Sequence, residues 1–295
     1  MSRALVLGGG GPVGIAWESG LIAGLAQGGV DLGAADHIQG TSAGAFVGLR
    51  LAMGEACATL ADPILSDATS MVRNVARSTR KPPDLTQVMR IMAKAKEAKR
   101  DLAEARAEIG ALALAAPTMT EDEYIQSFGR QFAALGDDAW PTRSFACTGV
   151  AADTGAFQLW TQDSGVGVGR AVAASCSFPG IYPPVTINGQ RWIDGGARSM
   201  TNADLITGHD VVLIVQVRMS EWTPGGALAK LFDYLEPEVA SLEAAGAKVI
   251  SILPDPASVT ALGGNPMDFE KRAGAARAGL IQGLATAEAI KAAWG

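Results

Sequence analysis

The chain has 295 residues, of which 48% are hydrophobic and 18% charged, so it can bury a large core and is not disordered as a whole. Its net charge of −6 does not suit the neutralisation of phosphates, so we expect no nucleic-acid partner. The three cysteines are far apart, which excludes a disulfide framework and a cysteine zinc site. No stretch reaches the roughly 18 apolar residues of a membrane span, and no signal-peptide pattern opens the chain, so we expect a cytoplasmic protein.

The first 54 residues alternate between strand and helix patterns. Residues 4–7 form an apolar run that glycines end, as in a buried parallel strand, and residues 15–27 follow a helical pattern. A short strand is predicted at residues 37–39 and a helix at residues 45–53. This order predicts an α/β fold, with a mainly parallel sheet that helices flank.

Residues 62–131 have no strand pattern and are rich in Ala, Lys, Arg and Glu. Residues 73–106 contain ten basic and four acidic residues, a local charge of +6 that leaves −12 for the rest of the chain. We interpret residues 62–131 as a helical cap inserted into a single domain of residues 1–295.

Strand patterns return after this segment. They cover residues 144–151 and 156–160, then residues 185–187 and 191–193 around Asn188-Gly189, a strong hairpin signal. Further strands are predicted at residues 211–217 and 248–253, and an Ala-rich helix within residues 266–294.

The glycine-rich loop after the first strand has two interpretations besides that of a close-packing turn. Gly9, Gly11 and Gly14 match the dinucleotide fingerprint, but the second strand ends at Gly40 and lacks the acidic residue that binds ribose. Alternatively, the backbone N–H groups of this loop stabilise a developing oxyanion at the start of a helix.

Gly40, Ser42 and Gly44 match the nucleophile-elbow pattern between a strand and a helix. In such a turn the serine Oγ is exposed at the end of the sheet, and the N–H of Ala43 points to an incoming carbonyl oxygen. The plainer interpretation is that Ser42 only caps the following helix.

A nucleophilic serine needs a base, and the sequence offers two histidines and one well-placed aspartate. His37 lies on the strand that leads into the elbow, where we expect a structural imidazole, and nothing in the sequence places His209 near Ser42. Asp194 ends a predicted strand, where open α/β sheets carry functional groups, and Gly195 and Gly196 follow it. An ordinary Asp-Gly turn would give the same pattern.

Together, in this order, residues 9–14, 40–44 and 194–196 resemble the patatin-like phospholipase family. Residues 174–179 and 182–184 are also similar to the segment that precedes the family's aspartate strand. The resemblance covers residues 1–54 and about 144–220 and leaves residues 62–131 and the C-terminal third unassigned.

The resemblance implies a three-layer α/β fold and a Ser–Asp dyad that hydrolyses lipid esters without a metal or organic cofactor. Ser42 would be the nucleophile and Asp194 the proton acceptor. The predicted oxyanion hole and the motif glycines that shape the site are Gly9, Gly10, Gly11 and Ala43, with Gly14, Gly40, Gly44, Gly195 and Gly196.

Two positions depart from the family pattern and keep other interpretations open. Val13 stands where Arg or Lys is usual, and Asp204 stands where a proline often follows the asparagine that matches Asn202. A catalytically weak lipid-binding protein and a nucleotide-binding domain therefore remain alternatives. We also expect a shielded site that raises the pKa of Asp194. We interpret the basic insertion as a solvated helix with ion pairs, and peripheral membrane contact through it is the alternative.

Overall fold

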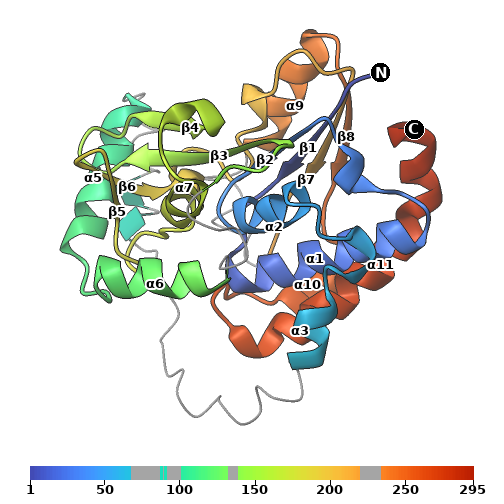
Figure 1. The fold of residues 1–295 in the computed structure, drawn as a ribbon, viewed down its shortest axis with the longest axis horizontal. Coiled ribbons are helices and arrows are strands. Elements are labelled where there is room, and N and C mark those ends of the chain that lie inside the picture. Colours follow the sequence, from blue (N-terminus) through green and yellow to red (C-terminus); the bar gives the residue numbers. More distant parts are fainter. Residues whose placement is uncertain (68–86, 89, 92–100, 132–138, 220–233) are drawn as a thin grey trace.

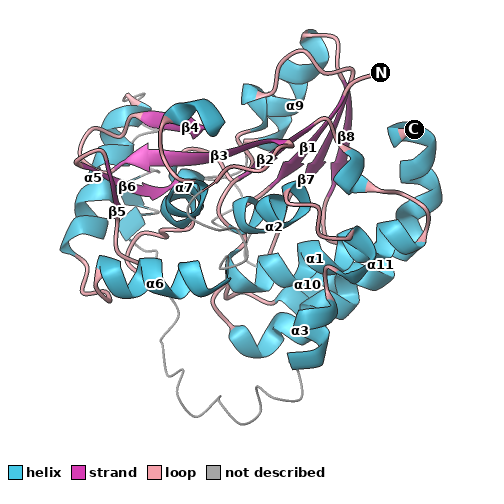
Figure 2. Cartoon of the chain, in the orientation of Figure 1, coloured by secondary structure: helices cyan, strands magenta, loops and turns pink. Residues whose placement is uncertain are grey.

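The computed structural model describes residues 1–67, 87–88, 90–91, 101–131, 139–219 and 234–295. Its centre is a sheet in the order β5-β6-β3-β2-β1-β7-β8, with β4 also paired to β3 (Figures 1 and 2). The strands are β1 Arg3–Leu7, β2 His37–Gly40, β3 Ser144–Ala151, β4 Phe157–Trp160, β5 Val185–Ile187, β6 Gln190–Asp194, β7 Val211–Val215 and β8 Lys248–Ile252.

The described helices cover both faces of this sheet. They are α1 Gly11–Gln27, α2 Ala43–Ala52, α3 Asp62–Asp67, α5 Leu102–Ala115, α6 Glu121–Gln131, α7 Val168–Ser175, α9 Leu235–Ala244, α10 Pro256–Leu262 and α11 Arg272–Trp294. Two 3-10 turns, η7 Gly195–Ala197 and η8 Ala203–Leu205, follow β6.

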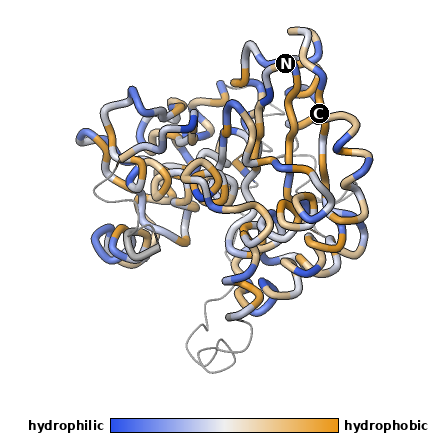
Figure 3. The backbone as a smooth tube through the Cα atoms, turned by 45° about the vertical axis from the view of Figure 1, so that its right-hand side comes forward, coloured by the Kyte–Doolittle hydropathy of each residue, from blue (hydrophilic) through white to orange (hydrophobic). Residues whose placement is uncertain are grey.

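Alternate residues of each strand face different layers. In β1, Leu5 and Leu7 join the large core beneath α1, α2 and α7, whereas Ala4 and Val6 pack toward α9. The apolar face of α5 packs on β3 and β6 through Ile109 and its neighbours. Hydrophobic colour accordingly runs through the interior strands in Figure 3. The three-layer α/β fold expected from the sequence is confirmed.

Parallel pairing joins β3, β2, β1, β7 and β8, whereas β4, β5 and β6 pair antiparallel with their neighbours. The turn at Asn188-Gly189 joins β5 to β6, as predicted. Helices α1 and α2 begin at Gly11 and Ala43, earlier than the predicted starts at residues 15 and 45. Glycine and proline disfavour helix interiors but are tolerated in a first turn, so composition alone placed these starts too late.

Helix α1 is held against the C-terminal helix α11 by glycines on both (Figure 1). A Cβ atom on Gly20 would lie 2.0 Å from the Ala276 carbonyl oxygen, and one on Gly279 would lie 2.3 Å from that of Trp17. Larger residues here would force the helices apart. The C-terminal third is therefore part of the same packed unit as the first helix.

Residues 62–131 are helical wherever the structure describes them at length, in α3, α5 and α6. Most of the basic stretch at residues 73–106 lies outside the described residues. The assignment of residues 62–131 as a cap within a single domain stays a prediction.

The two histidines stack on each other, with ring centroids 5.8 Å apart. His37 Nδ1 lies 2.7 Å from the Ser144 Oγ at the first residue pair of β2 and β3. Ser42 follows the other end of β2, which is four residues long and spans roughly 10 Å or more at about 3.3 Å per residue. This excludes His37 as a direct base for Ser42.

Burial, and then the charge of neighbouring His209, lowers the pKa of His37 from its ordinary value of 6.5 to about 4. The unfolded chain therefore takes up this proton at higher pH than the folded chain, and stability is lost as pH falls from about 6.5 to 4. We expect the His37→Asn variant to lose about 3 kcal/mol less stability over this range than the wild type. Urea unfolding at several pH values measures this, and parallel stability curves for the two proteins would contradict it.

Candidate active site

Ser42 lies in a sharp turn between the end of β2 and the start of α2. Its backbone has φ +53° and ψ −115°, a region that costs a non-glycine residue about 1–3 kcal/mol and persists only where the surroundings enforce it. The enforcing contact is at Gly44, where a Cβ atom would lie 2.0 Å from the Leu7 carbonyl oxygen. The Gly44 N–H donates to the Gly8 carbonyl oxygen at 2.9 Å. The predicted elbow is therefore present, with the glycine that its geometry requires.

A second segment supports both backbone polar groups of Ser42. The Ser175 Oγ accepts a hydrogen bond from the Ser42 N–H at 3.1 Å, and the Cys176 thiol donates to the Ser42 carbonyl oxygen at 3.1 Å. The resemblance within residues 174–179 was the only sequence signal for this segment, and it did not reveal the contact. The elbow is thus held from α7 as well as from β1.

Asp194 reaches Ser42 because β6 runs antiparallel to β3. The register pairs Asp194 with Gly149, two residues beyond the pairing of Cys147 with Gly40 on the opposite side of β3. The sequence interpretation relied only on the position of Asp194 at the end of a strand in an open α/β sheet, and it did not give the direction of that strand. It is the return of an antiparallel hairpin strand that places the carboxylate at the elbow.

The Asp194 side chain is 2% exposed. Its Oδ1 accepts a hydrogen bond from the Gly196 N–H at 2.8 Å, and its Oδ2 has no well-formed hydrogen bond among the described residues. Burial raises the pKa of Asp194 from 3.8 to about 7, although the nearby Ser42 hydroxyl and the Gly196 N–H pull the pKa down. The Ser42 hydroxyl therefore lies close to the carboxylate without completing an aligned bond to Oδ2, as is common before substrate binds. A buried carboxylate with one open oxygen can accept a proton near neutral pH.

The backbone donors of the predicted oxyanion hole are not equivalent. The Gly9 N–H already donates to the Met200 carbonyl oxygen at 2.8 Å, so Gly9 fixes the loop. Gly10, Gly11 and Ala43 line the cavity beside Ser42, and no hydrogen bond within the described part of the chain uses their N–H groups. These three N–H groups are the ones that an oxyanion could meet.

The glycine loop is held in place without the basic residue that the family usually carries. Val13 is fully buried, and its N–H donates to the Pro266 carbonyl oxygen at 3.2 Å. Gly11 has φ +60°, and a Cβ atom there would lie 2.8 Å from the same oxygen. The loop is therefore held by a C-terminal segment, through a backbone hydrogen bond and a close approach of Gly11 to Pro266.

Ser42 and Asp194 lie in a cavity of about 390 Å³. Its walls are mostly apolar and come from distant parts of the chain, including Ile109 of α5, Phe128 of α6 and Phe269 before α11. Arg272 adds a cationic group to the lining. A mostly apolar cavity around a serine and a carboxylate suits an acyl chain whose carbonyl carbon reaches Ser42.

No group of three or more His, Cys, Asp or Glu side chains that could hold a metal occurs among the residues that the structure describes. None of the described helices is both long enough and apolar enough to cross a bilayer.

A family model described as patatin-like phospholipase matches residues 5–206, more than half of the chain. The chain belongs to the patatin-like phospholipase family. No curated protein matches it.

Among solved structures, VipD from Legionella pneumophila is 16% identical with a TM-score of 0.47, and the match covers 98% of this chain and 67% of VipD. ExoU, in its complex with SpcU from the type III secretion system of Pseudomonas aeruginosa, is 19% identical with a TM-score of 0.35. That match covers 96% of this chain and 52% of ExoU, so the chain spans about half the length of that relative.

If Asp194 is the base, hydrolysis depends on its ionised form. We expect kcat/KM for a neutral ester to rise about tenfold per pH unit below pH 7 and to level off above it, because the pKa of Asp194 is raised to about 7. Initial rates between pH 4.5 and 9, with circular dichroism to show that the protein stays folded, measure this. A midpoint near 4 would contradict a shielded carboxylate.

Proposed function

We propose that this protein is a serine acyl hydrolase that cleaves carboxylic ester bonds of lipids through an acyl-serine intermediate. The observation that carries the proposal is the juxtaposition of Ser42, in a strained elbow, with the buried carboxylate of Asp194, whose Oδ2 is open. Membership of a phospholipase family supports lipid ester hydrolysis at the level of the family. The dyad itself and the substrate are the parts that experiment must test.

In the first half-reaction the Ser42 Oγ attacks the ester carbonyl carbon while Asp194 accepts the hydroxyl proton. The carbonyl oxygen becomes an oxyanion that the N–H groups of Gly10, Gly11 and Ala43 stabilise, each worth about 3–4 kcal/mol in comparable sites. When the tetrahedral intermediate collapses, the C–O bond to the alcohol breaks and the alcohol leaves with the proton from Asp194. The acyl group then remains on Ser42.

In the second half-reaction Asp194 takes a proton from a water molecule, which attacks the acyl carbon. Collapse of this intermediate returns the proton to the Ser42 Oγ and releases the fatty acid. The raised pKa of Asp194 suits both the uptake and the return of the proton. A carboxylate with a pKa of about 7 is a stronger base than one of ordinary pKa, and its acid form can still give the proton back near neutral pH. The dyad needs no third residue to orient its base, since the Gly196 N–H already fixes the Asp194 Oδ1.

The cavity supports an apolar acyl chain as the recognised part of the substrate. Val88, Ile109 and Phe128, all within the predicted insertion, contribute to its walls. A phospholipid, a lysophospholipid and an acylglycerol each present such a chain, and the proposal covers all three.

Nucleotide binding is the less favoured alternative. The glycine loop opens into a mostly apolar cavity that also holds the Asp194 carboxylate, and this carboxylate would repel a pyrophosphate bound at the loop even though Arg272 also lines the cavity. The alternative of a catalytically weak lipid-binding protein was based on the unusual residues Val13 and Asp204. Both have partners in the structure, which weakens this argument: the Val13 N–H donates to Pro266, and Asp204 pairs with Arg198 at 2.6 Å.

Hydrolysis of p-nitrophenyl esters of graded chain length tests the dyad. We expect Ser42→Ala to abolish turnover and Asp194→Asn to lower kcat by about 10²- to 10⁴-fold, because the first removes the nucleophile and the second its base. Ser241→Ala and Asp163→Asn are matched controls, since both side chains are exposed and neither lines the cavity.

Equal rates of hydrolysis in the wild type and both dyad variants would contradict the roles proposed for Ser42 and Asp194. A folded wild type that binds fatty esters but neither hydrolyses them nor reacts with a fluorophosphonate would instead favour the lipid-binding protein. A thermal shift with NAD would favour the nucleotide-binding domain.

Contact with a membrane surface is a separate part of the proposal. The basic side chains of Arg90, Lys94, Lys96, Lys99 and Arg100 would attract anionic lipid, at about 1 kcal/mol for each charge near the surface. All but Arg90 lie outside the described residues. We expect replacement of the five by Gln to weaken sedimentation with phosphatidylserine vesicles at least tenfold and to leave ester hydrolysis in solution unchanged. Undiminished vesicle binding would contradict the membrane role.

A further inference from the structure

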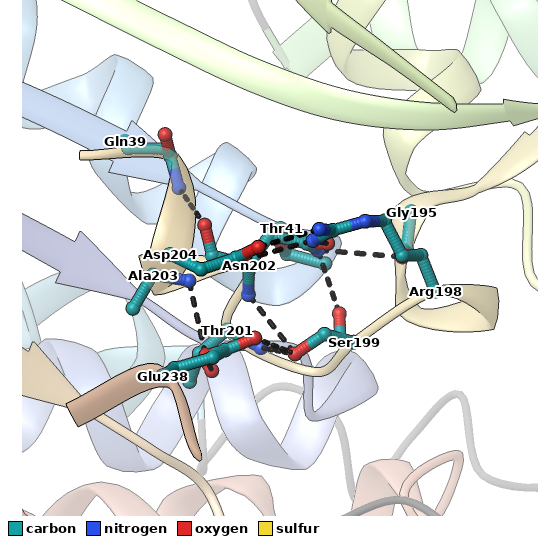
Figure 4. A network of polar contacts seen from close by, with 10 residues as sticks. All are labelled: Gln39, Thr41, Gly195, Arg198, Ser199, Thr201, Asn202, Ala203, Asp204 and Glu238. Atoms are coloured by element: carbon teal, nitrogen blue, oxygen red, sulfur yellow. Dashed lines mark hydrogen bonds and ion pairs between the residues drawn. The ribbon is translucent and has the colours of Figure 1, made fainter. Parts of the chain in front are cut away.

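Asn202 lies eight residues after Asp194, at the start of η8, and its backbone is strained. Its φ of +51° lies in the left-handed region, and its side chain is completely buried. Asparagine tolerates this conformation better than most residues, yet a buried amide in it must find several partners. Figure 4 shows that Asn202 occupies the middle of a polar network.

The side-chain amide of Asn202 faces both halves of the proposed dyad. Its Nδ2 lies 3.1 Å from the Thr41 Oγ1, 3.3 Å from the Gly195 carbonyl oxygen and 2.6 Å from the Ser199 carbonyl oxygen. Thr41 is the residue before Ser42, and Gly195 is the residue after Asp194. One amide group therefore links the elbow to the aspartate loop.

The other polar atoms of Asn202 are held as well. Its carbonyl oxygen accepts a hydrogen bond from the Gln39 Nε2 on β2 at 2.7 Å, and its Oδ1 accepts one from Arg198 at 2.8 Å. Arg198 is held in turn by Asp204, the residue that replaces the family's usual proline. With these partners the Asn202 side chain has no freedom to rotate away from Thr41 and Gly195.

The loop around Asn202 is fastened by a buried carboxylate on α9. Glu238 accepts hydrogen bonds from the Ser199 Oγ at 2.5 Å, from the Ala203 N–H at 3.0 Å and from the Thr201 hydroxyl (Figure 4). Met200 lies between Ser199 and Thr201, and its carbonyl oxygen accepts a hydrogen bond from the Gly9 N–H. Residues 199–203 therefore contact the glycine loop, the serine elbow and the loop that follows Asp194.

We propose that Asn202 is a positioning residue that sets the alignment of Ser42 with Asp194 by joining Thr41 to Gly195. The inference rests on the proposed acyl hydrolase function and goes beyond it. Asn202 touches neither the reacting atoms nor the cavity. Its loss would shift the two loops relative to each other, and a misplacement of about 1 Å can cost about 10² in rate.

Asn202→Gly is the sharpest test, because glycine keeps the left-handed backbone and removes only the side chain. We expect kcat for a p-nitrophenyl ester to fall 10- to 100-fold with KM within about threefold, because alignment is lost and the acyl cavity is not. Asn188→Gly is the matched control. Asn188 also has a positive φ, of +52°, but lies exposed in the β5–β6 turn.

Thr41 gives a second test that does not depend on how well the Asn202 variant folds. The Thr41 Oγ1 also lies 2.9 Å from the Thr148 Oγ1. Thr41→Val removes both of these hydrogen bonds with little change in shape, and Thr41→Ser keeps the hydroxyl. We expect Thr41→Val to lower kcat at least tenfold and Thr41→Ser to retain it within about threefold. In the double variant Asn202→Gly/Thr41→Val, the loss of kcat should be clearly smaller than the product of the two single losses, because both changes break the same Asn202–Thr41 hydrogen bond.

Three results would overturn the inference: an unchanged kcat in folded Asn202→Gly, fully multiplicative losses in the double variant, or equal losses in Thr41→Val and Thr41→Ser. Failure of the proposed function looks different, since Ser42→Ala would then retain wild-type rates. Should Asn202→Gly fail to fold, the pair of Thr41 variants decides the question alone.

Discussion

The site depends on one close approach of two backbone segments, at Gly44 against the Leu7 carbonyl oxygen. With no room for even one extra carbon, the chain leaving β2 must turn at once into α2, and Ser42 takes up the strain as a positive φ. Such a conformation persists only where neighbours over-determine it. Here the Gly8 carbonyl oxygen, the Ser175 hydroxyl and the Cys176 thiol each hold a backbone group of the turn. The position of Ser42 in the wall of the cavity follows from the close contact between Gly44 and Leu7.

The second half of the site is a balance between burial and hydrogen bonding at Asp194. Burial favours the neutral acid, and the Ser42 hydroxyl and the Gly196 N–H favour the carboxylate. Leaving Oδ2 without a fixed partner keeps one oxygen available for the proton of Ser42. Glu238 shows the contrasting case, since three donors surround its carboxylate and commit it to holding a loop.

The sequence carried the parts of the site that depend on local geometry. Gly40, Ser42 and Gly44 could be recognised because a tight turn admits few residues, and a parallel sheet followed from buried strands separated by helices. What it could not carry were contacts across long separations. Nothing local shows that the amide of Asn202 meets Thr41, 161 residues away, or that the Gly9 N–H is already engaged by Met200. The route of Asp194 to Ser42 was also hidden, because it depends on the register of β6 with β3.

Part of the chain that holds the glycine loop lies outside residues 5–206, the segment that the family model matches. That segment ends at residue 206, yet the Val13 N–H donates to the Pro266 carbonyl oxygen. In addition, α1 packs closely against α11 through glycines on both helices. A substitution near Pro266 would therefore move the glycine loop, with the N–H groups of Gly10 and Gly11, and leave Ser42 and Asp194 in place. The C-terminal third thus helps to shape the candidate site although the family model does not cover it.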